Sequence, residues 1–274
     1  MTNDYTRVLE ATERHLQALK ASGVRFLTVE SETLRQLQQA PPPPARKVQP
    51  PSDKSDQSDK SDTPPPENTE TPMAALRARA VVCVKCPHLA GSRKNVVFGV
   101  GDINAALMFV GEAPGADEDR QGEPFVGAAG QLLTRIIKTM GFSREQVYIA
   151  NILKCRPDTP GQSAGNRKPT VGEMKTCLPY LLEQIDLIRP KVIVALGATA
   201  VEGLLGKTEP IGKLRGRFQV FRGIPLMPTF HPSYLLRNQA LAEKRKVWED
   251  MLQVLEKLAL PVTAKQRGYF LKAG

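Results

Sequence analysis

The chain has 274 residues and a formal net charge of +10, because 38 Lys and Arg face 28 Asp and Glu. No apolar run approaches the roughly 18 residues that span a bilayer, and the first residues lack the apolar stretch of a signal peptide, so we expect neither a membrane protein nor a secreted disulfide scaffold. The positive charge favours a polyanionic partner such as nucleic acid, while a soluble basic protein without such a partner is the alternative.

The first 72 residues differ from the rest of the chain in composition. Residues 1–40 hold five acids and five bases, and the apolar residues between Asp4 and Lys20 recur at helical spacing. This predicts an N-terminal helical segment, either a small appendage or a docking helix for a partner protein. Residues 41–72 hold ten of the 23 prolines and almost no large apolar residue, which predicts a disordered linker.

The remaining residues carry the positive charge and alternate between two kinds of pattern. Residues 73–274 hold 29 bases and 17 acids, a net charge of +12. Apolar runs predict strands at residues 105–111, 147–151, 191–197 and around 225–229, and helical patterns predict helices at 127–140, 170–188, 198–205 and 241–258. Pro179 inside the second of these helices predicts a kink or a late start.

This alternation of strands and helices predicts an α/β fold, a three-layer α/β/α sandwich with a central, mostly parallel four-stranded sheet. We assign residues 73–260 to this α/β domain and residues 261–274 to a C-terminal tail. Functional sites in such sheets lie at the carboxyl ends of the strands. Three of the four predicted strands end there in polar or glycine-rich turns, with the sequences GEAPG, NILKCRP and TFHPSY.

The four cysteines of the chain are placed like a set of ligands. Cys83 and Cys86 form a C-x-x-C pair before the first strand, Cys155 follows the second strand, and Cys177 lies in the next helix. Four thiolates complete the coordination shell of Zn²⁺ or of a [4Fe–4S] cluster, and the number of ligands does not distinguish the two. A redox-active pair and four buried free thiols are the alternatives.

Three polar motifs follow the predicted strands. GEAPG at residues 111–115 leads into an acidic, glycine-rich loop that lacks the G-K-[ST] ending of a phosphate-binding loop. Asn151 ends the second strand and is followed by CRP and, further on, by Asn166 and Arg167. HPSYLLR begins at His231, after the last strand. Taken singly, these motifs fit a solvated loop and a structural histidine as well as a catalytic site.

Four features occur together in this chain: GEAPG with PFVG, the run from Asn151 through CRP to NR, the four-cysteine pattern and HPSYLLR. Their order resembles that of family-4 uracil-DNA glycosylases, the iron–sulfur branch of their superfamily. The resemblance covers about residues 75–258. It implies hydrolysis of the bond between uracil and deoxyribose in single- or double-stranded DNA, the first step of base-excision repair. It also implies a [4Fe–4S] cluster on the four cysteines, and action as a monomer in a prokaryotic cytoplasm, at the nucleoid.

The resemblance assigns the substrate pocket to residues that match the motifs of the family. Phe125 matches the aromatic residue that stacks on the flipped-out uracil, and Asn151 matches the residue that pairs with uracil O4 and N3–H. His231 matches the histidine near uracil O2, where a neutral imidazole can donate a hydrogen bond to the departing base. The implied substrate-binding set is completed by Ala113, Gly115 and Asn166.

Two carboxylates are candidates for activating the attacking water. The best-known branch of the superfamily carries an aspartate where this chain has Ala113, which has no functional group. The neighbouring Glu112 is the first candidate. The second is Glu118, which matches a family glutamate that interacts with the residue equivalent to Asn166. A carboxylate at either place would orient water and offset positive charge on the sugar.

The HPSYLLR segment is expected to hold DNA. An apolar side chain at Leu235 or Leu236 would fill the gap that the flipped base leaves, with core packing of both leucines as the alternative. Ser233 and Arg237 complete this predicted DNA-binding set, with Arg237 on a phosphate group. A second basic stretch at residues 213–222 offers either phosphate contacts or a solvated loop.

Two departures from the family pattern affect the expected chemistry. Residues 158–165 look like an insertion between Cys155 and Cys177, which would alter DNA contacts and leave the cysteine set intact. No histidine lies between His88 and His231, which argues against the covalent trapping of the base that a related branch performs. Two other functions stay open: a DNA-binding or lesion-sensing module with weak activity, and a glycosylase for deaminated purines.

Overall fold

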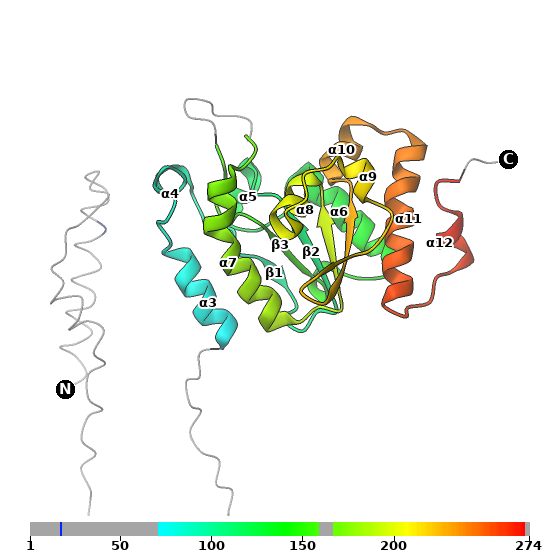
Figure 1. The fold of residues 1–274 in the computed structure, drawn as a ribbon, viewed down its shortest axis with the longest axis horizontal. Coiled ribbons are helices and arrows are strands. Elements are labelled where there is room, and N and C mark those ends of the chain that lie inside the picture. Colours follow the sequence, from blue (N-terminus) through cyan, green and yellow to red (C-terminus); the bar gives the residue numbers. More distant parts are fainter. Residues whose placement is uncertain (1–16, 18–70, 159–166, 272–274) are drawn as a thin grey trace, which may run out of the picture. The chain divides into compact units, whose positions relative to one another are not determined.

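The computed structural model describes Gln17 and residues 71–158 and 167–271 (Figure 1). The predicted N-terminal helix, nearly all of the predicted linker, and Asn166 with most of the predicted insertion lie outside this part of the chain. The chain divides into two compact units, and every element described below belongs to the second, residues 65–274. No helix in the described ranges is long and apolar enough to cross a membrane.

The second unit is built around a six-stranded sheet with the strand order β1-β3-β2-β4-β6-β5. The four inner strands run parallel, and the two edge strands run antiparallel to their neighbours. The strands are β1 (Val100–Gly101), β2 (Leu107–Gly111), β3 (Tyr148–Asn151), β4 (Val192–Leu196), β5 (Gln219–Phe221) and β6 (Ile224–Thr229). The predicted α/β fold is confirmed, but the sheet has six strands where the sequence predicted four. The missed strands have two and three residues, too few to show an alternating pattern.

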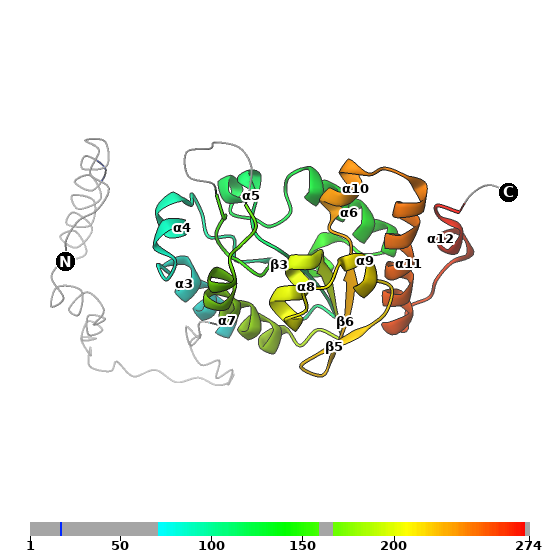
Figure 2. The same ribbon diagram turned by 45° about the horizontal axis from the view of Figure 1, so that its top comes forward.

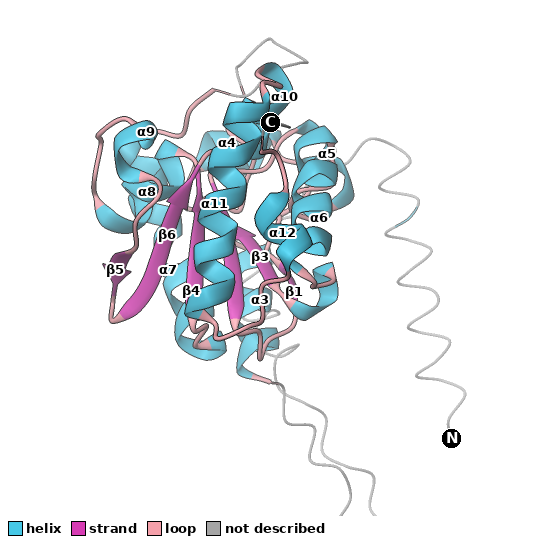
Figure 3. Cartoon of the chain, turned by 90° about the vertical axis from the view of Figure 1, so that its right-hand side faces the viewer, coloured by secondary structure: helices cyan, strands magenta, loops and turns pink. Residues whose placement is uncertain are grey.

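Alternate residues of the inner strands pack on opposite faces of the sheet, because successive side chains of a strand point to opposite sides. In β2, Leu107 and Phe109 belong to the apolar cluster on one face, and Met108 and Val110 belong to the cluster on the other. All residues of β2 and β4 are buried. Burial on both faces explains why these strands appear in the sequence as continuous apolar runs. The two apolar clusters form a core on each side of the sheet, between the strands and the helices that Figure 3 shows around them.

Helices cover both faces of the sheet (Figures 1 and 2). The cluster around Leu107 includes residues of α6 and α11, whereas the cluster around Met108 includes residues of α7 and α8. The helices are α3 (Pro72–Val81), α4 (Pro87–Ser92), α5 (Ala116–Gln121), α6 (Ala128–Met140), α7 (Val171–Ile188), α8 (Ala198–Leu205), α9 (Ile211–Leu214), α10 (Pro232–Arg237), α11 (Leu241–Lys257) and α12 (Ala264–Gly268), with a 3₁₀ turn at Arg144–Gln146.

The four predicted helices begin and end within one residue of the expected limits, as α6, α7, α8 and α11. α7 begins directly after Thr170, whose side chain accepts the backbone N–H of Glu173 at 3.2 Å, and it continues through Pro179 to Ile188. A late start after the proline is therefore wrong, because the capping box at Thr170 fixes the first turn. The short helices had no predicted counterpart.

The predicted C-terminal tail contains α12, which is bonded to α11. Trp248 Nε1 donates a hydrogen bond to the carbonyl oxygen of Gln266 at 2.6 Å, and Arg245 Nη1 donates to the carbonyl oxygen of Tyr269 at 2.8 Å. The indole ring of Trp248 also meets the Tyr269 ring edge-on, with 5.6 Å between the ring centroids. These contacts make α12 part of the same compact unit as the sheet.

Candidate active site

A cavity of about 550 Å³ opens at the carboxyl edge of the sheet. Asn151 is the last residue of β3, Glu112 and Ala113 follow β2, and His231 follows β6. The cavity is lined by Glu112, Ala113, Gly115, Glu118, Phe125, Ala129, Asn151, Leu196, Gly197, Ala198, Thr199, His231, Ser233 and Arg237. Nine of these belong to the predicted catalytic, substrate-binding and DNA-binding sets. Three predicted residues besides the cysteines are not in this lining. Asn166 lies outside the described residues, and Leu235 and Leu236 line a second cavity.

The lining includes one stretch that the sequence prediction did not assign. Residues 196–199 end β4 and begin α8, and all four line the cavity. Their position could have been predicted, because the strand expected at 191–197 should end at the same edge as its neighbours. Their side chains carry no ionisable group, so no chemical signal pointed to them.

Asn151 carries a buried amide whose oxygen is free to accept a hydrogen bond from a ligand. The residue is 2 % exposed, and its Oδ1 atom has no hydrogen-bond partner among the described residues. A buried acceptor without a partner costs free energy unless a ligand satisfies it. Gly111 makes this position possible, since a Cβ atom there would lie 2.4 Å from Asn151 Oδ1 and 2.6 Å from Phe125 Cζ. The glycine at the end of β2 therefore allows the amide and the phenyl ring to lie close together.

Phe125 is held in an unusual backbone conformation. Its φ of 56° is left-handed, which a non-glycine residue adopts only when its surroundings enforce it. The guanidinium group of Arg144 donates hydrogen bonds to the carbonyl oxygens of Phe125 and Pro124 at 3.1 and 2.9 Å. Gly130 leaves room for this turn, since a Cβ atom there would lie 1.8 Å from the Phe125 oxygen. The phenyl centroid lies 5.6 Å from that of His231, so both rings border the cavity.

His231 has a defined tautomer because it caps the N-terminus of α10. Its Nδ1 accepts the backbone N–H of Ser233 at 3.2 Å and lies 2.8 Å from Ser233 Oγ. A nitrogen that accepts an N–H carries no proton, so the neutral ring carries its proton on Nε2. Burial lowers the pKa of His231 to about 4, with Arg237 acting in the same direction and Glu118 against it. At neutral pH the imidazole is therefore uncharged and donates through Nε2.

The two carboxylate candidates differ in their surroundings. Glu118 accepts the backbone N–H groups of Gly115, Val126 and Gly127 at 3.1, 3.0 and 2.9 Å. It joins the start of α5 to the start of α6 and so supports the turn between them. Among the described residues, Glu112 has no side-chain hydrogen bond or ion pair, although it lines the same cavity. Both carboxylates border the cavity, and only that of Glu118 is engaged with backbone N–H groups of the described residues.

The other acids of this segment are structural. Asp119 is 2 % exposed and accepts the backbone N–H groups of Lys94 and Asn95 at 2.9 and 3.3 Å. Asp117 pairs with Arg120 one turn further along α5. The acidic stretch after GEAPG is thus not a solvated loop, because it forms a helix that is bonded to the chain near residue 95.

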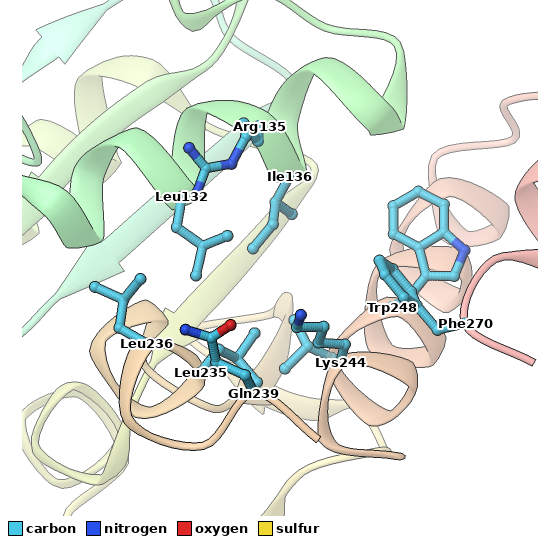
Figure 4. Close-up of a pocket in the computed structure, with 10 residues that line it drawn as sticks. Leu132, Arg135, Ile136, Leu235, Leu236, Gln239, Lys244, Trp248 and Phe270 are labelled. Carbon is cyan, nitrogen blue, oxygen red and sulfur yellow. The ribbon is translucent and has the colours of Figure 1, made fainter. Parts of the chain in front are cut away.

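The HPSYLLR segment forms α10, and its residues line two different cavities. Ser233 and Arg237 line the cavity described above. Leu235 and Leu236 line a second, apolar cavity of about 170 Å³ between α6, α10 and α11 (Figure 4). Leu235 is 5 % exposed and is a core residue, whereas Leu236 keeps part of its surface exposed. The alternative of core packing therefore applies to Leu235.

The basic stretch at residues 213–222 is partly engaged within the protein. Arg215 forms a two-pronged ion pair with the fully buried Asp250, with N–O distances of 3.0 and 2.6 Å. Arg222 pairs with Asp186 on the surface. Arg215 is therefore a structural residue, which corrects its expected role as a phosphate contact.

The four cysteines lie around one small cavity of about 20 Å³. Cys83 and Cys86 lie between α3 and α4, Cys155 follows β3, and Cys177 lies in α7. Segments that are far apart in the sequence thus meet at these side chains, at the opposite end of the 151–155 segment from Asn151.

The surroundings of the sulfur atoms fit a thiolate-bound group. Arg93 Nη1 donates to Cys155 Sγ and the backbone N–H of Lys154 donates to Cys177 Sγ, both at 3.2 Å, and such donors are typical of iron–sulfur sites. Burial raises the pKa of Cys177 to about 11 and also raises the pKa of Cys86 and Cys155, so at neutral pH a bound cation is needed to form these thiolates. Within the described ranges, no three His, Cys, Asp or Glu side chains are arranged to hold a single metal ion.

The fold and the site define an α/β protein whose sheet-edge cavity offers an amide, an aromatic ring and a neutral imidazole to a planar ligand. Residues 98–252 match the family model of the uracil DNA glycosylase superfamily. The chain is 47% identical over 182 residues to the type-4 uracil-DNA glycosylase of Thermotoga maritima, which covers 65% of this chain and 91% of that protein. It is 40% identical over 205 residues to the type-4 uracil-DNA glycosylase of Sulfurisphaera tokodaii, which covers 72% and 89%. The chain therefore belongs to the uracil-DNA glycosylase superfamily and, within it, to the type-4 family.

Proposed function

We propose that the protein is a uracil-DNA glycosylase, which hydrolyses the N-glycosidic bond of uracil in DNA and leaves an abasic site for base-excision repair. The observation that carries the proposal is the meeting of Asn151, Phe125 and His231 in one cavity at the carboxyl edge of the sheet. Relatives of the type-4 family are named for this activity. We place its action on the DNA of a prokaryotic cytoplasm, as a monomer.

Base recognition starts from a uracil that has left the duplex, because a stacked base is out of reach of a pocket. The ring of Phe125 stacks on the uracil, a contact worth about 1–3 kcal/mol. Asn151 Oδ1 accepts the uracil N3–H, and its Nδ2 donates to O4. Cytosine presents an acceptor and a donor in the reverse order at these positions, so it leaves the buried amide unsatisfied. The buried Oδ1 without a partner supports this pairing.

Bond cleavage moves the electron pair of the C1′–N1 bond onto the base, and part of this negative charge settles on O2. His231 donates its Nε2 proton in a hydrogen bond to O2 as the charge develops, which stabilises the transition state. The low pKa of His231 keeps the ring neutral, so it acts as a donor and the uracil departs as an anion.

Water supplies the hydroxyl group that replaces the base. Glu112 accepts a hydrogen bond from the water, the oxygen bonds to C1′, and the proton passes to the carboxylate. The same negative charge offsets the positive charge on the sugar. Glu118 positions the segment around Phe125 through its three backbone hydrogen bonds, so we assign the water to Glu112 and not to Glu118.

DNA is held by the face that carries α10. Leu236 fills the gap left by the extruded base, and Arg237, which is exposed at the cavity, contacts a phosphate next to the uracil. Ser233 fixes the ring of His231 from the same helix. The net charge of +12 on residues 73–274 suits a polyanion and predicts binding that weakens steeply with salt.

The four cysteines hold a [4Fe–4S] cluster in this proposal. The hydrogen bonds to the sulfurs of Cys155 and Cys177 and the type-4 relatives support it. The bound cluster supplies a covalent tie between the α3–α4 segment, the chain after β3 and α7. Anaerobically purified protein should contain about four iron atoms per chain together with sulfide. A colourless protein with one zinc ion and no iron would overturn this assignment.

The activity is tested with labelled oligonucleotides that carry uracil, hypoxanthine or thymine, each in single and double strands. We expect abasic product from the uracil substrates only, and Asn151→Ala provides a matched control that keeps the cavity and removes the amide. Absence of product from every uracil substrate refutes the proposal. Tight binding without cleavage would support a lesion-sensing module, and faster release of hypoxanthine would support a glycosylase for deaminated purines.

A further inference from the structure

Lys154 is a buried cation that the proposed reaction does not use. The residue is 2 % exposed and lies between Asn151 at one cavity and Cys155 at the other. Its Nζ donates to the carbonyl oxygen of Asn151 at 3.1 Å and to Gln184 Oε1 at 2.6 Å, and it lies 5.9 Å from the centroid of the Phe98 ring. Two acceptors and a ring face are suitable surroundings for an ammonium group.

Within the described ranges, no carboxylate forms an ion pair with Lys154. A buried charge is costly unless an opposite charge lies near it. A group beside Lys154 that can carry negative charge is Cys177, whose Sγ accepts the Lys154 backbone N–H at 3.2 Å. Thiolates around a bound cluster supply this negative charge, whereas four neutral thiols do not.

The same residue connects the two cavities mechanically. Its Nζ reaches back to the carbonyl of Asn151, while its backbone N–H bonds to Cys177 in α7. Gln184, two turns further along α7, holds the ammonium group in place and is itself fixed, because its Nε2 donates to the Phe98 carbonyl oxygen and to Tyr148 Oη, both at 3.0 Å. Each of these side chains has at least one hydrogen-bond partner within the network, which restricts its motion.

We propose that Lys154 is a positioning residue, whose ammonium group fixes the backbone of Asn151 for uracil and offsets the negative charge of the group bound by the cysteines. The inference rests on the proposed function and extends it. Loss of the bound group removes the charge that holds Lys154 in place, which loosens Asn151. Occupancy of the cysteine cavity and binding of uracil are thereby coupled.

The test uses Lys154→Met, which keeps the length of the side chain and removes its charge and hydrogen bonds. Free uracil is the probe, because this product competes for the cavity and its inhibition constant reports on Asn151 without the chemical step. We expect this constant to rise about 10-fold and iron to be lost to a chelator faster than from the wild type. The matched control is Lys138→Met, which removes an exposed cation in the last turn of α6 that lines neither cavity and should leave both measurements unchanged.

Lys154→Met also tests the electrostatic role, because the loss of a positive charge beside the cluster should make its reduction potential more negative. Gln184→Met separates the two roles. It removes one of the two acceptors of Nζ and keeps the charge of Lys154, so the uracil inhibition constant should rise while the potential stays near the wild-type value. A merely structural role for Lys154 would leave the potential of Lys154→Met at the wild-type value.

Excision of uracil by the wild type is measured on the same preparations. If the wild type excises uracil while Lys154→Met keeps its uracil inhibition and iron release, the inference is overturned and the proposed function stands. If the wild type excises none, the proposed function fails, and iron release from Lys154→Met compared with Lys138→Met still decides the electrostatic role. Should Lys154→Met not fold, Gln184→Met carries the test, and an unchanged uracil inhibition constant in that variant overturns the inference.

Discussion

The two cavities at either end of the 151–155 segment are built in opposite ways. The cavity at Asn151 has a volume of about 550 Å³, and two of its polar groups, Asn151 Oδ1 and the Glu112 carboxylate, have no partner among the described residues. The cavity at Cys155 has a volume of about 20 Å³, and the sulfurs of Cys155 and Cys177 accept hydrogen bonds from the protein.

Under the proposed function, the cavity at Asn151 takes an exchangeable ligand and the cavity at Cys155 holds a permanent one. Unpaired groups in a roomy cavity cost stability and are retained where a ligand satisfies them. Paired groups in a closed cavity contribute to the fold. Substitutions of the unpaired side chains at the first cavity should therefore change the reaction rate with little effect on the free energy of unfolding. Substitutions of side chains that hold the backbone in place should lower the free energy of unfolding more than the reaction rate.

Glu112→Gln should produce the largest loss of rate. The amide has the shape of the carboxylate but takes up no proton and carries no charge, so kcat should fall about 10²–10⁴-fold. Because Glu112 has no side-chain partner among the described residues, the melting temperature should stay near that of the wild type. Single-turnover excision and thermal unfolding measure the two quantities.

Glu118→Gln is the control for this prediction, with the opposite expected pattern. Glu118 accepts three backbone N–H groups, and a glutamine side chain has only one acceptor atom for them. The variant should lose about 1–3 kcal/mol of stability. A loss of rate equal to that of Glu112→Gln without any loss of stability would move the catalytic carboxylate to Glu118.

His231→Ala should reduce kcat by about 10²–10³-fold, the usual cost of removing one donor to a developing negative charge. KM should change less, because the hydrogen bond strengthens as the charge appears on O2. Measuring kcat and KM on one uracil oligonucleotide tests this split. An unchanged kcat with a raised KM would give His231 a role in binding alone.

The sequence was sufficient for those parts of the site that follow a strand directly. Asn151 and His231 lie where parallel strands end, and the α/β pattern predicts that these ends meet. The tautomer of His231 was not predictable, because it depends on the Ser233 N–H that closes the cap. The bracing role of Glu118 depends on backbone groups eight and nine residues away, and the burial of Lys154 depends on α7. These contacts arise only when the elements pack together.

Leu235→Ala and Leu236→Ala should separate neighbouring residues of α10 into core and DNA-contacting ones. Leu235 is 5 % exposed, so its truncation should cost about 2–5 kcal/mol of unfolding free energy. Leu236 is partly exposed, so its truncation should lower excision from double strands about 10-fold and leave single strands nearly unaffected, since only a duplex leaves a gap to fill. Equal losses on both substrates would exclude the wedge role of Leu236.

The smallest expected effect is that of pH on kcat between pH 7.5 and pH 5.5. Burial favours the neutral form of the ionisable groups in both cavities, but with opposite consequences. It raises the pKa of Cys177 to about 11, and the neutral thiol that results binds no metal. It lowers the pKa of His231 to about 4, and the neutral imidazole that results is the form that donates from Nε2. A histidine with the ordinary pKa of 6.5 would be mostly protonated at pH 5.5, but His231 stays neutral there, so its contribution to kcat should be flat over this range and fall only near pH 4.

As the pH is lowered, the free energy of unfolding should begin to decrease at a higher pH than kcat does. In the unfolded chain His231 is protonated near pH 6.5, whereas in the folded chain it stays neutral down to about pH 4. The stability that this group contributes is therefore complete above pH 6.5 and is lost as the pH falls toward 4. His231→Ala removes this contribution, so the difference in melting temperature between wild type and variant should shrink between pH 7 and pH 4.5. A single-turnover rate that falls as the pH is lowered, with a midpoint near pH 6.5, would contradict the low pKa of a desolvated imidazole. A rate that rises on acidification with that midpoint would make the protonated ring the active form.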